Sequence, residues 1–187
     1  MMRHAIVPEA QFLNLVAERS SQPIASCYQC HKCTAGCPTA YAMDFGPAQV
    51  VRLIQLGQRQ ALLSSRSIWL CVGCETCGTR CPNGICVGRI ADTLKVMATE
   101  AGIRPAEPAI LHFHRSFLNS VRRFGRAHEV TMLVEYKLRA GNLLADLDLG
   151  WKLLRAGKLP LLPRSVRRRW QIARLFAFRP PEEECRP

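Results

Sequence analysis

Eight of the ten cysteines fall into two stretches with the same spacing, and this repeat constrains the fold more than any other feature of the sequence. In each stretch two residues separate the first three cysteines, three residues precede the fourth, and a proline follows it. Proline fixes φ and has no N–H group, so it turns the chain out of the loop. The cysteines of the first motif are Cys27, Cys30, Cys33 and Cys37, and those of the second motif are Cys71, Cys74, Cys77 and Cys81.

This spacing is typical of bacterial proteins that bind two [4Fe–4S] clusters. Three cysteines in one tight loop bind one cluster, while the fourth cysteine binds the other cluster. We therefore predict two [4Fe–4S] clusters as cofactors and no catalytic residue in this chain. The expected ligands are Cys27, Cys30, Cys33 and Cys81 for one cluster, and Cys71, Cys74, Cys77 and Cys37 for the other.

Two other uses of cysteine fit the sequence less well. Structural zinc sites draw on pairs of cysteines and do not need a regular third and fourth cysteine with a proline. A basic zinc module that binds nucleic acid is the alternative from a different functional class. Disulfides form in oxidising compartments, and the first residues lack the pattern of a secretory signal. We therefore expect a cytoplasmic protein.

The charge of the chain is concentrated in its C-terminal part. The formal net charge is +12. Residues 1–104 contain ten Lys or Arg and six Asp or Glu, whereas residues 105–187 contain sixteen Lys or Arg and eight Asp or Glu. Eight thiolates and two cluster cores make the first part about neutral. Since no aromatic-basic repeat is present, we expect no nucleic-acid partner. No apolar stretch approaches the ~18 residues of a transmembrane segment.

Hydrophobic periodicity predicts helices and no alternating strand pattern. Each motif is followed by a helix, at 47–57 with Asp44 as its cap and at 87–101. Further helices are expected at 8–19, at 110–124, twice within 129–156, and at 166–178. The predicted fold is mainly α, an α-helical ferredoxin-like dicluster domain at 23–104. An N-terminal helical arm at 1–22 and a basic, helical C-terminal extension at 105–187 for subunit docking complete the expected organisation.

Three further residues are candidates with open roles. His31 lies inside the first motif, where it would be either a loop histidine or a group that tunes a cluster. Cys86 is expected to be a small buried residue. Cys185 lies in the charged tail, where no role is predicted.

The sequence resembles the C subunits of heterodisulfide reductases. The likeness is carried by both cysteine motifs and by the approach Ile68-Trp69-Leu70-Cys71, and it covers about residues 20–104. The resemblance implies an electron-transfer subunit between two partners. One is an A-like subunit with flavin and iron–sulfur clusters, and the other is a B-like cysteine-rich catalytic subunit. No Cys-Cys-Gly sequence of the catalytic kind occurs here, so no small-molecule substrate is expected.

An alternative is the iron–sulfur subunit of another flavin-dependent or membrane-associated dehydrogenase. Subunits of the succinate dehydrogenase type carry further cysteines nearer the N-terminus, whereas no cysteine precedes Cys27. Glycolate oxidase types usually fuse cysteine-rich catalytic domains to the ferredoxin part, for which 187 residues are too few.

Overall fold

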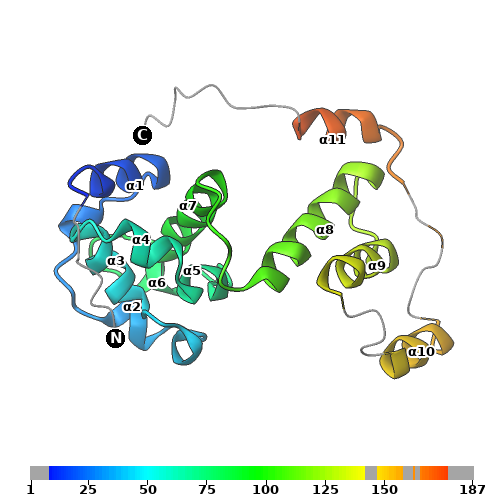
Figure 1. Ribbon diagram of the computed structural model, residues 1–187, viewed down its shortest axis with the longest axis horizontal. Coiled ribbons are helices and arrows are strands. Elements are labelled where there is room, and N and C mark those ends of the chain that lie inside the picture. The colour runs from blue at the N-terminus through cyan, green and yellow to red at the C-terminus, as the bar shows by residue number, and fades with distance from the viewer. Residues whose placement is uncertain (1–8, 142–146, 158–161, 163–164, 177–187) are drawn as a thin grey trace. The chain divides into compact units, whose positions relative to one another are not determined.

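The regular secondary structure in the described part of the chain is helical, which confirms the predicted fold class. The structure is a computed structural model and describes residues 9–141, 147–157, 162 and 165–176, among which there is no strand. The chain divides into two compact units, Met1–Glu107 and Pro108–Pro187 (Figure 1). The helices of the first unit are α1 (Phe12–Ser20), α2 (Lys32–Ala35), α3 (Pro47–Gln55), α4 (Arg59–Leu63), α5 (Arg66–Leu70), α6 (Thr76–Arg80) and α7 (Val87–Glu100).

The core of the first unit is built around α3 and α7, the helices that follow the two motifs. Proline at the first position of α3 suits a helix start, and the helix buries Val50, Val51 and Ile54. The predicted stripe of α7 is also buried, including Ile90 and Leu94. Helix α1 contacts both α7 and α3 and buries Phe12 and Val16, so the N-terminal helix packs on this core.

The structure contains four short helices that hydrophobic periodicity did not predict: α2 and α6 within the motifs, and α4 and α5 between them. The expected role of Asp44 as the cap of α3 is wrong. Its carboxylate accepts the backbone N–H of Arg66 at 2.7 Å, which satisfies a free donor at the start of α5. At α3 the backbone N–H of Gly46 instead donates to the side chain of Gln49 at 2.9 Å. Asp44 thereby holds the helix that leads directly into Cys71.

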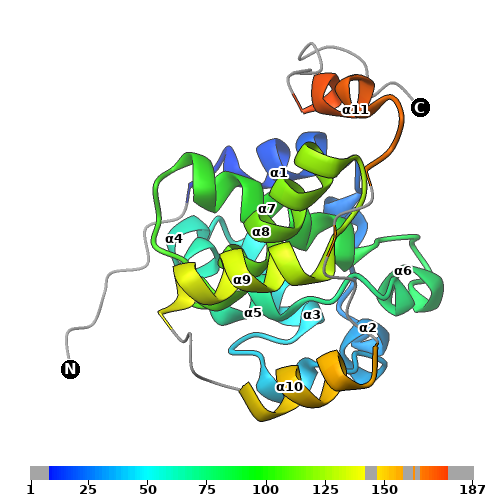
Figure 2. The same cartoon turned by 90° about the vertical axis from the view of Figure 1, so that its right-hand side faces the viewer.

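The second unit contains α8 (Pro108–Phe124), α9 (Glu129–Ala140), α10 (Leu147–Arg155) and α11 (Arg169–Leu175). Helices α8 and α9 lie side by side as a hairpin (Figures 1 and 2). The side chain of His128 accepts the backbone N–H of Thr131 and so caps α9. Helix α11 is shorter than expected at its start, since it begins at Arg169, and positions 177–178 lie outside the described residues. Over the described part of the chain, no helix has the length and apolar character needed to cross a membrane.

Candidate cluster sites

The two motifs fold into the same local structure. In each, the second cysteine lies between two residues with positive φ. These are Gln29 and His31 around Cys30, both at 61°, and Gly73 at 64° and Glu75 at 57° around Cys74. A short helix follows at once, α2 in the first motif and α6 in the second. This backbone path curls each loop around its cysteines.

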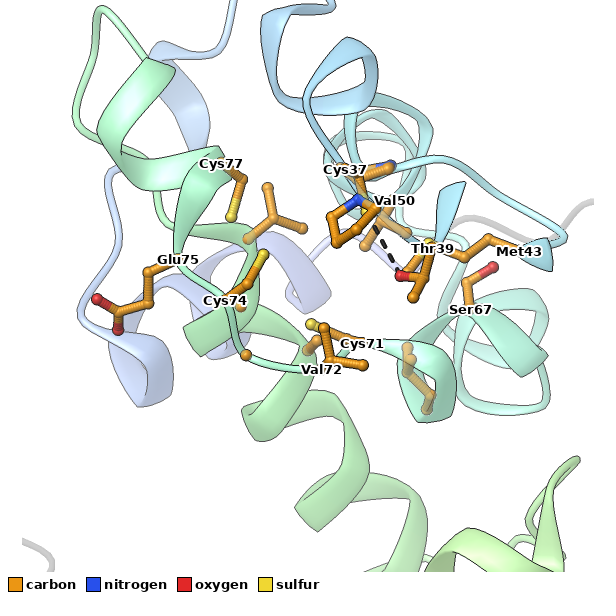
Figure 3. Close-up of a pocket in the computed structure, with 17 residues that line it drawn as sticks. Cys37, Thr39, Met43, Val50, Ser67, Cys71, Val72, Cys74, Glu75 and Cys77 are labelled. Carbon is orange, nitrogen blue, oxygen red and sulfur yellow. Dashed lines mark hydrogen bonds between the residues drawn. The ribbon is translucent and has the colours of Figure 1, made fainter. Parts of the chain in front are cut away.

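The cysteines line two cavities, which we number by the motif that supplies three of the four cysteines. The second cavity combines residues from both motifs. Cys71, Cys74 and Cys77 come from the second motif and Cys37 comes from the first. Figure 3 shows the sulfur atoms of Cys71, Cys74 and Cys77 turned toward a common space. Apolar side chains complete most of the lining, among them Met43, Val50, Ile68 and Ala91.

The first cavity has the complementary composition. It is lined by Cys27, Cys30 and Cys33 of the first motif together with Cys81 of the second. Val87, at the start of α7, lines both cavities. The structure therefore gathers the eight predicted ligands into two groups of four, each with three cysteines from one motif and one from the other.

Polar side chains approach several of the eight sulfur atoms, three of them within 3.5 Å. The side-chain amide of Gln29 donates to the sulfur of Cys27 at 3.3 Å. The hydroxyl of Thr39 lies 3.5 Å from the sulfur of Cys37, and that of Thr76 lies 3.4 Å from the sulfur of Cys74. Hydrogen bonds to sulfur and the degree of burial are the means by which a protein adjusts a cluster's potential.

The environments of the thiols differ in a way that bears on cluster assembly. Burial raises the pKa of Cys33 and of Cys71, and it raises the pKa of Cys77 to about 11. Cys74 is open to solvent, and hydrogen bonds from Thr76 lower its pKa. Because a cluster binds thiolates, assembly must displace protons from the buried sites.

Backbone groups of the motifs are held by side chains from distant parts of the chain. The side-chain amide of Gln55 donates to the carbonyls of Ile24 and Cys27, both at 3.2 Å. The ammonium group of Lys95 donates to the carbonyl of Cys71 at 3.3 Å. Sequence reasoning missed both residues. Their equivalent positions in the two repeats could have pointed to them, since each is the ninth residue of the helix that follows its motif.

The remaining candidates have distinct locations. His31 is exposed and lies on the lining of the first cavity. Cys86 is buried, as expected, and its sulfur lies beside Gly78 and Gly88. Trp69 is buried in the core of the first unit. Cys185 lies outside the described residues.

Comparison with known proteins agrees with the cysteine chemistry. The 4Fe-4S dicluster domain family matches residues 23–85. The chain is 31% identical over 131 residues to the C subunit of the ferredoxin:CoB-CoM heterodisulfide reductase of Methanosarcina mazei, a match that covers 70% of this chain and 76% of the relative. It is 36% identical over 102 residues to the C subunit of the ferredoxin:CoB-CoM heterodisulfide reductase of Methanosarcina acetivorans, covering 52% of this chain and 41% of the relative. It is 33% identical over 113 residues to an iron–sulfur C subunit of the CoB–CoM heterodisulfide reductase of Methanocaldococcus jannaschii, covering 60% of this chain and 57% of the relative.

The chain thus spans about half the length of these last two relatives. Its residues fit the cofactor of the matched domain, because each cavity offers four sulfur donors and the cubane cluster takes four. The chain carries two [4Fe–4S] clusters. With the match to the relative from Methanosarcina mazei spanning most of both proteins, the chain belongs to the family of the iron–sulfur C subunits of heterodisulfide reductases.

Proposed function

We propose that this protein relays electrons between two partner subunits of a heterodisulfide-reductase-like complex. One partner is an A-like subunit with flavin and iron–sulfur clusters. The other partner is a B-like cysteine-rich catalytic subunit. When bound, a [4Fe–4S] cluster accepts and releases one electron at a time. The observation that carries the proposal is the pair of cysteine-lined cavities with Val87 on the lining of both.

We assign the ligands by the composition of the cavities. Cys27, Cys30, Cys33 and Cys81 hold the cluster of the first cavity, and Cys71, Cys74, Cys77 and Cys37 hold the cluster of the second. The exchange of one cysteine between motifs ties the two loops together and keeps the clusters close. Apolar residues form much of the lining of the second cavity and reduce the contact of its cluster with water. The reduced thiols suit a cytoplasmic location.

The second unit is proposed to dock the protein on a partner. Among the described residues, every buried hydrophobic side chain belongs to the first unit, while Ser116, Ser120 and His128 are the buried residues of the second. Several large apolar side chains of the second unit are exposed instead, including Phe117, Leu118, Val134, Leu138 and Trp151. Large apolar side chains that a unit leaves exposed instead of burying are expected at a protein interface.

Charge indicates the character of that partner. The described residues of the second unit include twelve Lys or Arg and only three Asp or Glu. An acidic surface on the partner would complement this charge and speed association. We therefore propose that residues 105–187 dock on an acidic face of one of the two partner subunits.

The test is to tag the chain in its native host, purify it anaerobically and identify the accompanying proteins by mass spectrometry. We expect a flavoprotein and a second protein with Cys-Cys-Gly sequences. A membrane cytochrome or an unrelated dehydrogenase in their place would contradict the proposal and favour the alternative relay.

Surface variants test the docking role. Leu138→Asp and Trp151→Asp each place a charge on an exposed apolar position of the second unit and should reduce the yield of the partner proteins. Val96→Asp is the control, because Val96 is also apolar and exposed but lies on the first unit. Equal partner yields in all three variants would show that the second unit is not the docking surface.

A further inference from the structure

The helices after the two motifs occupy equivalent positions beside the two cavities. Helix α3 begins at Pro47 and α7 begins 40 residues later at Val87. Ala48 and Val51 of α3 line the first cavity, and their counterparts Gly88 and Ala91 line the second. A difference between paired residues is therefore a difference between the two clusters' surroundings.

One pair of equivalent residues makes the same hydrogen bond, but one side chain of the pair is neutral and the other is charged. Gln55 donates to the carbonyl of Cys27 at 3.2 Å, and its counterpart Lys95 donates to the carbonyl of Cys71 at 3.3 Å. Cys27 and Cys71 are the first cysteines of their motifs. A neutral amide thus supports the first motif, whereas an ammonium group supports the second.

The position of Lys95 makes its charge effective. Its side chain is only 13% exposed, and a partly buried charge is screened much less by water and salt than a surface charge. Reduction adds a negative charge to the cluster, so a nearby cation stabilises the reduced form and raises the midpoint potential. Gln55 itself is neutral. The guanidinium group of Arg52 donates to its side-chain oxygen at 3.3 Å, but Arg52 is exposed, so solvent screens that charge more than it screens the charge of Lys95.

Two carboxylates near the second cavity oppose this effect but are weaker. Asp92 lies 3.0 Å from the Lys95 ammonium group, and its side chain is 69% exposed. Glu75 is 64% exposed, lies 4.0 Å from Arg89, and its carboxylate points away from the cysteine sulfurs (Figure 3). Solvent screens both groups more than it screens Lys95.

The first turns of the two helices differ in the same direction. Val87 and Gly88 turn backbone N–H groups toward the sulfur of Cys77. At the matching position α3 has Pro47, which has no N–H group, and the N–H of Ala48 donates at 2.9 Å to the hydroxyl of Thr34. That hydroxyl in turn lies beside the sulfur of Cys33, so Ala48 acts on the sulfur only through Thr34. Hydrogen bonds to sulfur also raise a cluster's potential.

We propose that Lys95 sets the cluster of the second cavity at a more positive midpoint potential than the cluster of the first cavity. The first electron that enters the protein then resides at the second motif. This inference rests on the ligand assignment proposed above.

The experiment is an anaerobic redox titration of the full-length protein with both clusters, monitored by electron paramagnetic resonance. In Lys95→Gln the more positive midpoint should shift to a more negative value while the other stays in place. Glutamine makes the equivalent hydrogen bond in the first repeat, so this variant removes the charge and retains the contact. Gln55→Lys should shift the more negative midpoint upward, and Lys95→Arg should leave both midpoints near their original values.

Two controls make the result specific. Lys152→Gln removes an exposed lysine of the second unit and should change neither midpoint. Cys74→Ser should lose the second cluster and retain the more negative midpoint. The proposal is overturned if Lys95→Gln leaves both midpoints unchanged, or if it shifts the more negative one. Wild-type protein without two [4Fe–4S] clusters by iron and sulfide analysis would instead contradict the cofactor assignment itself.

Discussion

Backbone strain at single residues shapes both cysteine loops. Gln29, His31 and Glu75 adopt left-handed backbone conformations, which cost a residue other than glycine roughly 1–2 kcal/mol. The second motif has Gly73 where the first has Gln29. The structure accepts this strain because it brings the second cysteine of each motif to its cavity.

Two glycines with nearly the same φ should respond differently to substitution. A Cβ atom at Gly57 would lie 2.7 Å from the backbone nitrogen and oxygen of Glu9, whereas nothing lies within 4 Å of one at Gly73. We expect Gly73→Ala to cost about 1 kcal/mol through backbone strain alone, and Gly57→Ala to cost more because the N-terminal segment must shift. Thermal unfolding of the two variants measures this, and equal melting temperatures would contradict it.

Cysteine variants test the ligand assignment at the same scale. Cys74→Ser should lose about half of the bound iron, since one cluster loses a thiolate ligand. Cys86→Ala should retain all of it, because Cys86 is a buried residue that packs beside Gly78. Iron and acid-labile sulfide per protein are the quantities to measure. Loss of iron from the Cys86 variant would show that the ligand set is incomplete.

At the scale of elements, the α8–α9 hairpin depends on small residues rather than on a hydrophobic core. Ser116 and Ser120 are buried four residues apart on α8, which places them on one face of the helix. The hydroxyl of Ser120 accepts the backbone N–H of His128 at 2.8 Å. The hydroxyl of Ser116 is buried without a hydrogen-bond partner.

Ser116 therefore allows two substitutions with opposite outcomes. Ser116→Ala removes an unsatisfied hydroxyl and should leave the stability of the second unit unchanged or increase it. Ser116→Leu should destabilise the unit by about 1–3 kcal/mol, because the added volume must displace neighbouring side chains. Far-UV circular dichroism during thermal unfolding distinguishes these results. A stable leucine variant would mean that this contact is not tightly packed.

Helices with an apolar pattern that repeats over several turns could be predicted from the sequence. Short helices that depend on residues far away in the sequence could not. The stripe of α7 was predictable because Ile90, Leu94 and Met97 recur along one face. Helix α5 was missed because it has five residues and depends on Asp44, which lies 22 positions before the residue it caps. Local sequence patterns hold no information about such a partner.

For the whole molecule, the two units should be separable in function. Since the described buried hydrophobic side chains all lie in the first unit, a chain that ends at Glu107 should retain both clusters with the same absorbance spectrum and iron content. It should also lose its partner proteins during anaerobic purification, because the proposed docking surface is absent. Loss of clusters in the shortened chain would show that the second unit stabilises the first.

The sequence by itself determined the cofactor, the helical class and the two expected ligand sets, because cysteine number, spacing and the following prolines are local properties of the chain. The tertiary structure decided what surrounds those ligands. It placed Val87 at both cavities and set Lys95 and Gln55 on equivalent carbonyls. These contacts join residues that lie 24 and 28 positions apart, and only the folded chain brings such residues together.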